Sequence, residues 1–290
     1  MSNPFLRACL MGHPVAHSRS PMIHGHWLRT MGIAGAYDLV DLTGDEFPGF
    51  LKDLAARGYV GGNVTVPHKE AAYRLVDRRD EAASAIGAVN TVWLEGRVLF
   101  GGNSDAHGFI TDLDDCAPGW DVMDGRAVVL GAGGGARAAV FALARRGLDV
   151  AIINRTVARA EELARHYGGR VHGFGHEALA DFLREADVLV NCTSLGMSGA
   201  EALAIDLAPL KRSAVVCDMV YVPLETPLLT QARARGHRTV DGLGMLLQQA
   251  GFGFGKWFGA LPAVTPELRT LVEADIRAKT AGTGGGATTK

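Results

Sequence analysis

The sequence predicts an α/β protein made of two α/β units, on three observations. Apolar segments in the first 66 residues alternate as strand, helix, strand, helix, strand, an order typical of a parallel sheet with helices on its faces. The same alternation restarts at Arg126, after a break at Pro118–Gly125. A glycine-rich turn, Gly131–Ala136, then joins a strand to a helix. We therefore expect two domains in this chain.

Composition and charge exclude several classes of protein. The 290 residues are 48% hydrophobic and 21% charged, with a formal net charge of −2 and no long basic run, which argues against a nucleic-acid-binding surface. No apolar run reaches the roughly 18 residues that a membrane span needs, and no leader pattern is visible. Together these features predict a cytoplasmic protein that binds neither nucleic acid nor membrane.

The cysteines favour free thiols over a metal site. They lie far apart in the chain, without a Cys-x-x-Cys pair or a His/Cys cluster: Cys9, Cys116, Cys192 and Cys217. We expect buried thiols in a reducing compartment and no bound metal.

The first unit is predicted to begin with three strands and two helices. The strands are Phe5–Met11, Ala36–Leu42 and Tyr59–Val66, and the helices are Met22–Met31, with Ser20 as a possible N-cap, and Glu46–Arg57. Further elements are a helix over Arg74–Ala85, strands at Ala88–Leu94 and Val98–Phe100 joined as a hairpin, and a loop at Gly101–Gly108. Gly and Pro mark the breaks between these elements.

The second unit is predicted over residues 109–241. Its strands are Val128–Leu130, Val150–Ile153, Val188–Asn191 and Val215–Asp218, and its helices are Phe109–Cys116, Ala136–Arg146 and Val157–His166. Two more helices follow, at Leu243–Phe258, where three glycines weaken the helical pattern, and at Pro266–Lys279. Residues 281–290 are rich in Gly and Thr and are predicted to be a disordered tail.

Asn63–Lys69, which reads Asn-Val-Thr-Val-Pro-His-Lys, holds a cation in an unusual place. Pro67 ends the preceding strand and suits the first turn of a helix. Lys69 would therefore project from a helix start, where a positive charge opposes the helix dipole. The residue is either an ordinary surface charge or an ammonium group with a chemical task.

The turn Gly131-Ala132-Gly133-Gly134-Gly135-Ala136 fits the pattern G-x-G-x-x-G/A. It follows an apolar strand and opens an Ala-rich helix, as in the Rossmann dinucleotide-binding fold. Glycines there let a pyrophosphate approach backbone N–H groups at a helix N-terminus. The alternative is a plain strand-to-helix turn.

The end of the next strand indicates which dinucleotide is bound. A site for NAD usually has Asp or Glu there, whereas this chain has Asn154, Arg155 and Thr156, with Arg159 one turn further. The two guanidinium groups are suited to a 2′-phosphate, so NADP(H) is predicted over NAD(H). The alternative is a solvated helix face.

Polar residues of the first unit stand in loops that α/β sheets use for ligands. They are Ser18 and Ser20, Thr65, Asn90 and Asp105. Each also has a local explanation, because Ser20 and Asp105 suit helix N-caps and Asn90 suits a turn. Spacing alone does not show that they converge.

A series of ordered motifs makes the chain resemble the shikimate dehydrogenase family over nearly its whole length. They are His17-Ser-Arg-Ser-Pro21, Asn63–Lys69, Gly87-Ala-Val-Asn-Thr91, Gly101-Gly-Asn-Ser-Asp105, the glycine turn, Asn154-Arg-Thr156, Asn191-Cys-Thr-Ser-Leu-Gly-Met197, Asp218-Met-Val-Tyr221 and Asp241-Gly-Leu-Gly-Met245. The resemblance implies a first, substrate-binding domain over residues 1–108, completed by 242–280 as the C-terminal helices pack back on it. It also implies a Rossmann NADP-binding domain over 109–241.

The resemblance also implies roles for individual residues. Lys69 would be the acid–base residue and Asp105 its partner. Substrate would contact Ser18, Ser20, Thr65, Lys69, Asn90, Asp105, Tyr221 and Gln249. NADP would contact the glycine turn, Asn154, Arg155, Thr156, Arg159, Thr193, Met219 and Gly242. Three departures are visible: Ser104 where Thr is usual, Cys192 where Ala is common, and glycines at 251, 253 and 255 in a helix usually richer in alanine.

The reaction implied is the reversible, NADPH-dependent reduction of 3-dehydroshikimate to shikimate, in aromatic amino-acid biosynthesis. One alternative is a quinate/shikimate dehydrogenase with broader substrate or NAD use. Others are a non-catalytic NADP-sensing regulator and an enzyme for another amino- or keto-acid. The chain keeps both Lys69 and Asp105, which a regulator has no need to retain. A monomer or a homodimer is expected.

Overall fold

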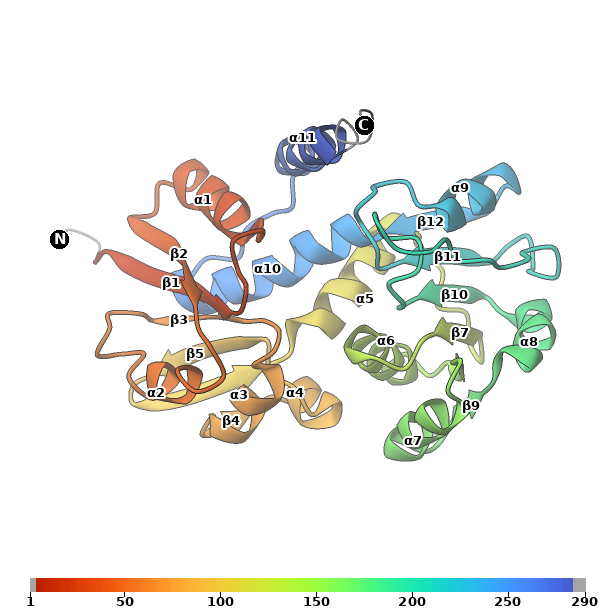
Figure 1. Ribbon diagram of the computed structural model, residues 1–290, viewed down its shortest axis with the longest axis horizontal. Helices are drawn as coiled ribbons and strands as arrows, with labels where there is room; N and C mark the ends of the chain where they lie inside the picture. Colours follow the sequence, from red (N-terminus) through yellow and green to blue (C-terminus); the bar gives the residue numbers. More distant parts are fainter. Residues whose placement is uncertain (1–3, 284–290) are drawn as a thin grey trace, which may run out of the picture. The chain divides into compact units, whose positions relative to one another are not determined.

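The computed structural model describes residues 4–283 (Figure 1). The chain forms two compact units. Within the described residues, unit 1 comprises the chain up to Gly108 together with Leu247–Leu268. Unit 2 comprises Phe109–Leu246 and the residues from Arg269 onward. The α/β fold class predicted from the sequence is confirmed.

Unit 1 contains a mixed sheet of six strands in the order β2-β1-β3-β5-β6-β4. β1 pairs in parallel with both β2 and β3, as the alternating pattern predicts. β5 pairs antiparallel with β3 on one side and with β6 on the other. The predicted hairpin is therefore confirmed. The strands are β1 (Leu6–Gly12), β2 (Gly35–Asp41), β3 (Gly61–Val64), β4 (Arg78–Arg79), β5 (Thr91–Glu95) and β6 (Val98–Gly102).

Several helices of unit 1 begin or end at residues other than those predicted, since side-chain caps help to decide where a helix begins. They are α1 (Ser20–Thr30), α2 (Phe47–Lys52), α3 (Lys69–Leu75) and α4 (Glu81–Ile86), with α5 (Ser104–Cys116) starting in this unit. The predicted helix Arg74–Ala85 is wrong, because the chain leaves α3 and the Asp80 side chain accepts a hydrogen bond from Ala83 N at 2.6 Å to cap a new helix. α2 ends at Lys52 and not at Arg57.

The sequence also suggested Ser20 and Asp105 as helix N-caps, and both suggestions are wrong. Ser20 is the first residue of α1, and the N-cap position is Arg19. α5 begins at Ser104, inside the predicted loop Gly101–Gly108. It begins there because the Asn103 side chain accepts a hydrogen bond from Asp105 N at 3.1 Å, which satisfies a free amide of the first turn. Asp105 is thereby left free to point elsewhere.

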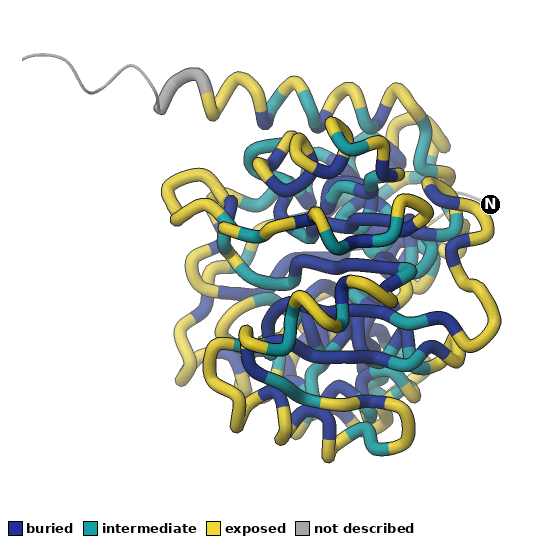
Figure 2. Tube along the Cα trace, turned by 90° about the vertical axis from the view of Figure 1, so that its right-hand side faces the viewer, coloured by how far each residue is buried: buried dark blue, intermediate teal, exposed yellow. Residues whose placement is uncertain are grey.

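Unit 2 contains a fully parallel sheet in the order β12-β11-β10-β7-β8-β9, the strand order of a Rossmann fold. Of its two central strands, β10 is buried along its whole length and β7 from Ala127 onward; Figure 2 draws buried residues in dark blue. The strands are β7 (Arg126–Leu130), β8 (Asp149–Ile153), β9 (Val171–Phe174), β10 (Val188–Asn191), β11 (Val215–Asp218) and β12 (Arg238–Asp241). The predicted Rossmann arrangement is confirmed.

The helices of unit 2 include two that the sequence analysis does not predict. α6 (Gly134–Arg145) and α7 (Val157–Tyr167) agree with prediction, except that α6 begins inside the glycine turn. The additional helices are α8 (Leu179–Glu185), after a short 3-10 turn at His176–Ala178, and α9 (Pro227–Ala234). α9 begins where Thr226 caps Leu229 N at 3.3 Å.

The C-terminal helices are α10 (Gly242–Phe258) and α11 (Pro266–Thr283). α10 forms despite its glycines, and at Gly253 the missing side chain is required, since a Cβ there would lie 2.5 Å from the Trp257 ring. The expected segment 242–280 is longer than the part that belongs to unit 1, which is Leu247–Leu268. The residues on either side belong to unit 2, in which Arg269 forms an ion pair with Asp241 at 2.5 Å. Of the tail predicted to be disordered, residues 281–283 belong to α11 and 284–290 lie outside the described residues.

The thiols agree with the sequence analysis only in part. All four cysteines are free, but only Cys9 and Cys217 are buried, whereas Cys192 is partly buried and Cys116 is exposed. Among the described residues no helix has the length and apolar character to cross a membrane. In the same part of the chain, His, Cys, Asp and Glu side chains form no cluster able to hold a metal ion.

Candidate active site

Lys69 and Asp105 form an ion pair in unit 1. Lys69 is the first residue of α3 and Asp105 the second of α5, and Nζ donates to Asp105 Oδ2 at 2.8 Å. The two side chains are 31% and 21% exposed, so the pair is partly shielded from water but open to a ligand. The carboxylate stabilises the ammonium form and offsets the unfavourable helix-start position of the cation.

Asn90 fixes the other oxygen of the same carboxylate. Its Nδ2 donates to Asp105 Oδ1 at 2.8 Å. Its own Oδ1 accepts from Ser104 N at 2.8 Å and from Thr91 Oγ1 at 3.0 Å. Because Asn90 is buried and its amide oxygen is held by these donors, its NH₂ group can only face the carboxylate. The orientation of Asp105 is therefore set by the fold.

Ser104 ties Gln249 of α10 to this group. Its hydroxyl donates to Gln249 Oε1 at 3.1 Å and lies 3.2 Å from Asn90 Oδ1. Ser104 thus supplies the hydroxyl that the family usually takes from Thr, and the departure at this position removes no hydrogen bond. The sequence analysis noted Ser104 only as a departure and missed its contact with Gln249.

Of the remaining predicted substrate residues of unit 1, Ser18 and Thr65 lie in loops that follow strands, and Ser20 is the first residue of α1. Ser18 Oγ is 3.2 Å from Ser20 Oγ, and it also accepts from Ser20 N at 3.2 Å. Thr65 follows β3 directly, and its backbone N donates to Met11 O at 2.9 Å. In the described part of the chain the Thr65 hydroxyl has no hydrogen-bond partner, so it can bind a ligand. Tyr221 belongs to unit 2.

The glycine turn of unit 2 has the geometry of a phosphate cradle. Gly131 has φ +103° and its amide donates to Ile153 O at 2.8 Å, which makes the sharp exit from β7. Gly133 is the N-cap of α6, Gly134 and Gly135 form its first turn, and Ala136 is buried beneath them. Amides at the start of this 12-residue helix point toward the turn, as anion binding requires.

A cavity of about 250 Å³ lies beside this turn. It joins the carboxyl ends of three strands, and its lining includes predicted residues from each: Gly131 after β7, Asn154 and Arg155 after β8, and Thr193 after β10. The other lining residues, which the sequence analysis missed, are Leu130, Ile153, His176, Ser194, Leu195 and Leu203. Small apolar and polar groups of this kind suit the adenosine part of a dinucleotide.

Arg155 is the cation of this cavity. It is exposed, and within the described residues it makes no hydrogen bond or ion pair, so its guanidinium is available to a phosphate. Asn154 is oriented by its own bond from Nδ2 to Thr156 O at 2.8 Å. Arg159 is exposed one turn along α7 and does not line the cavity.

Thr193, Met219 and Gly242 follow three neighbouring strands of the same sheet. Thr193 Oγ1 donates to Asn191 Oδ1 at 2.7 Å, and Asn191 in turn donates to Asp218 at 2.9 Å. Met219 packs between two glycines, since a Cβ on Gly242 would lie 2.2 Å from Met219 O and one on Gly135 would lie 3.1 Å from Met219 Sδ. The residues of unit 2 therefore fit a dinucleotide at the carboxyl edge of the sheet.

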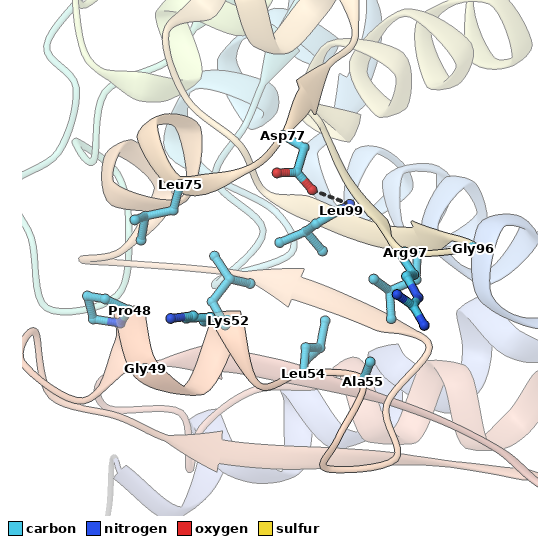
Figure 3. Close-up of a pocket in the computed structure, with 12 residues that line it drawn as sticks. Pro48, Gly49, Lys52, Leu54, Ala55, Leu75, Asp77, Gly96, Arg97 and Leu99 are labelled. Atoms are coloured by element: carbon cyan, nitrogen blue, oxygen red, sulfur yellow. Dashed lines mark hydrogen bonds between the residues drawn. The ribbon is translucent and has the colours of Figure 1, made fainter.

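A second hollow, of about 570 Å³, lies in unit 1 and holds none of the predicted site residues. It runs between α2 and the β5–β6 hairpin, and Leu54, Leu75 and Leu99 line it (Figure 3). Its carboxylate, Asp77, accepts a hydrogen bond from Leu99 N at 2.8 Å. We assign no role to this groove.

The Rossmann unit with its arginine-lined cavity, and the ammonium–carboxylate pair of the other unit, define an NADP-dependent oxidoreductase. Residues 10–92 match the family model described as the shikimate dehydrogenase substrate binding domain, and residues 117–219 match the model described as shikimate / quinate 5-dehydrogenase. The chain belongs to the shikimate dehydrogenase family.

Curated relatives and solved structures agree with this membership. The chain is 57% identical to shikimate dehydrogenase (NADP(+)) of Mesorhizobium japonicum over 93% of this chain and 96% of that protein. It is similar to Thermus thermophilus shikimate 5-dehydrogenase in complex with NADP(H) and shikimate, with TM-score 0.82 and 38% identity over 94% of this chain and 100% of the other. It is also similar to Corynebacterium glutamicum quinate dehydrogenase in complex with NAD, with TM-score 0.86 and 30% identity over 94% and 100%.

Proposed function

We propose that the protein catalyses the reversible, NADPH-dependent reduction of 3-dehydroshikimate to shikimate, a step of chorismate and aromatic amino-acid biosynthesis. The observation that carries this proposal is the Lys69–Asp105 ion pair held by Asn90, in a chain 57% identical to an NADP-dependent shikimate dehydrogenase. NADPH, when bound, supplies the hydride for the ring carbonyl carbon. The protein's own residues supply binding, orientation and the proton.

Lys69 is proposed to protonate the substrate's carbonyl oxygen as that oxygen becomes an alkoxide. Asp105 Oδ2 accepts a hydrogen bond from Lys69 Nζ at 2.8 Å, which holds the proposed proton donor in place. A positioned acid of this kind contributes about 10²–10⁴-fold to a rate. In shikimate oxidation the same residue takes the proton back as the neutral amine.

Substrate binding is proposed to use the polar groups around this pair. Ser18 and Ser20, helped by Tyr221, would bind the carboxylate. Thr65, Asn90, Asp105 and Gln249 would bind the ring hydroxyls. The support in unit 1 is that Asn90, Asp105 and Gln249 are joined, directly or through Ser104, by hydrogen bonds of 3.1 Å or less.

Cofactor binding is proposed to use unit 2. The glycine turn, residues 131–136, would hold the pyrophosphate, and Asn154, Arg155, Thr156 and Arg159 the adenosine 2′-phosphate. Thr193, Met219 and Gly242 would lie along the nicotinamide end. Arg155 is the best supported of the arginines, since it lines the cavity without a partner among the described residues. Unit 1 is thus the proposed substrate-binding and catalytic domain and unit 2 the NADP-binding domain.

We also propose a cytoplasmic enzyme that works as a monomer or a homodimer, on the grounds of its membership of a biosynthetic enzyme family.

The test is the NADP-dependent oxidation of shikimate, followed by absorbance of the reduced nicotinamide, with quinate in parallel. Turnover of shikimate with NADP supports the proposal. Faster turnover of quinate would instead assign the protein to the quinate-using branch, which the similarity to a quinate dehydrogenase makes the second candidate. Binding of NADP without turnover of either would indicate a non-catalytic sensor.

A further inference from the structure

A buried hydrogen-bond chain in unit 1 leads from Tyr37 through Asn63 to the Asn90 segment of the proposed substrate site. Asn63 of β3 is 6% exposed, and its Oδ1 accepts from the Tyr37 hydroxyl at 2.6 Å. Its Nδ2 donates to Asn90 O at 3.2 Å and to Thr91 Oγ1 at 3.3 Å. Asn63 is therefore saturated by protein groups, and it holds the segment that carries Asn90.

Tyr37 lies at the other end of this chain. Its phenol group donates a hydrogen bond to Asn63 Oδ1 at 2.6 Å. Burial raises the pKa of Tyr37 well above its ordinary value, so the group stays a neutral donor. The Tyr37 hydroxyl therefore holds Asn63, whose amide group contacts both Asn90 and Thr91.

The ring of Tyr37 is held independently of its hydroxyl. His24 stacks on it with centroids 4.1 Å apart and planes at 20°, and Trp257 packs at 5.8 Å. His24 itself is fully buried, and burial lowers its pKa to about 3, so it stacks as a neutral ring. A Tyr37→Phe substitution consequently removes the hydroxyl and leaves the aromatic packing in place.

We propose that Tyr37 is a positioning residue of the dehydrogenase site, which through Asn63 holds the segment that carries Asn90 and so sets the place of the Asn90–Asp105–Lys69 group. This inference rests on the proposed function, in which Asn90 and Asp105 contact the substrate and Lys69 transfers the proton. It adds a residue that acts through Asn63 and not by contact with the substrate. Misalignment of this group affects both substrate binding and turnover.

Tyr59 provides a matched control. It is as buried as Tyr37, belongs to the same unit, and its hydroxyl accepts from Arg7 at 3.1 Å and donates to Asp38 at 3.1 Å. Neither Arg7 nor Asp38 is part of the proposed site. Tyr37→Phe removes a buried hydroxyl and Tyr59→Phe a partly buried one, and each hydroxyl makes hydrogen bonds within unit 1. Thermal unfolding of both variants therefore measures the purely structural effect of each change separately from the kinetics.

The experiment measures kcat and KM for shikimate, the Kd for NADPH by fluorescence, and thermal unfolding, for wild type and both variants. We expect Tyr37→Phe to lower kcat/KM about tenfold or more, with a raised KM, and to leave the NADPH Kd unchanged. Tyr59→Phe should stay within about twofold of wild type. Equal kinetics in the two variants, or wild-type kinetics in Tyr37→Phe, would overturn the positioning role of Tyr37 but not the proposed function.

Asn63→Asp tests the chain from its other end. It keeps an acceptor for Tyr37 but replaces the donor to Asn90 O by an oxygen, so it should show the same signature in kcat and KM. If Tyr37→Phe does not fold, this variant decides the question. Absence of shikimate turnover by the wild type would overturn the proposed function and this inference with it.

Discussion

Lys69 Nζ donates to Asp105 Oδ2 at 2.8 Å, and Asn90 holds the second oxygen of that carboxylate at the same distance. The two residues of the ion pair are 36 positions apart and begin two different helices. A cation that is unfavourable at a helix start thus has a carboxylate partner, and the ion pair explains how Lys69 can be a charged proton donor.

Removal of the Lys69 ammonium should affect turnover more than binding. We expect Lys69→Ala to lower kcat by about 10²–10⁴-fold with a modest change in KM. The measurement is steady-state shikimate oxidation at saturating NADP. Lys52→Ala, which removes an exposed lysine of the same unit, should leave both constants unchanged. A raised KM at unchanged kcat would make Lys69 a binding residue only.

Reversal of charge at Arg155 should change cofactor preference. Arg155→Asp replaces the unpaired cation of the cavity by a group that repels a 2′-phosphate and can accept from a ribose hydroxyl. The ratio of the Kd for NADH to that for NADPH should fall at least tenfold, since charge-assisted hydrogen bonds contribute about 1.5–3 kcal/mol. Arg165→Asp makes the same charge change near the far end of α7 and should not alter the ratio.

Gly133 should be required for the cofactor and not for the fold. Its backbone is extended, with φ −92° and ψ −167°, and a Cβ there would meet no atom within 4 Å. Gly133→Ala should therefore leave the melting temperature unchanged or raised while weakening NADPH binding at least tenfold, because the backbone approaches the pyrophosphate closely. Gly44→Ala, at a similarly open loop position, should change neither quantity. NADPH binding of wild-type strength in Gly133→Ala would place the phosphates elsewhere.

Asp112 should make the stability of the protein depend on pH. This buried residue of α5 packs against Gly244, and burial raises the pKa of its carboxyl to about 7. The unfolded chain ionises near pH 4, so the folded state binds the extra proton and stability falls as pH rises from about 4 to 7. Between pH 5.5 and 8.5 the loss should be about 2 kcal/mol.

Asp112→Asn removes this titration. Denaturant unfolding should show the variant gaining stability over wild type as pH rises from 5.5 to 8.5, whereas Asp115→Asn, at an exposed neighbour, should not. A constant difference between Asp112→Asn and wild type across this range would show that the carboxyl does not titrate there.

The fold was largely predictable because its central strands are continuous apolar runs. Val188–Asn191 and Val215–Asp218 are fully buried strands of a parallel sheet, and such strands stand out in sequence. Short strands at the edge of a sheet were harder to predict. β9, Val171–Phe174, has a glycine and an exposed histidine, and its four residues show no hydrophobic periodicity that would distinguish them from a loop. Helix starts were missed where a cap such as Asn103 lies inside a glycine-rich stretch.

The candidate site could be predicted less well than the fold from the residue types alone. Distances in sequence do not show that Lys69 and Asp105 meet, and their roles entered through the family resemblance. Tyr37 carries no signal of its own, and Asn63 stands out only as part of the Asn63–Lys69 motif. The two residues lie on β2 and β3, the strands on either side of β1, and nothing in the sequence shows their 2.6 Å contact. His176 lines the cavity and belongs to a 3-10 turn that no sequence pattern predicts.

The most direct test of the account is steady-state oxidation of shikimate and of quinate, each with NADP and with NAD. The account predicts that shikimate with NADP has the highest kcat/KM of the four pairs, that Lys69→Ala loses this activity by about 10²-fold or more, and that NAD is the poorer cofactor. A higher kcat/KM with quinate or with NAD, or no turnover of shikimate by the wild-type protein, would contradict it.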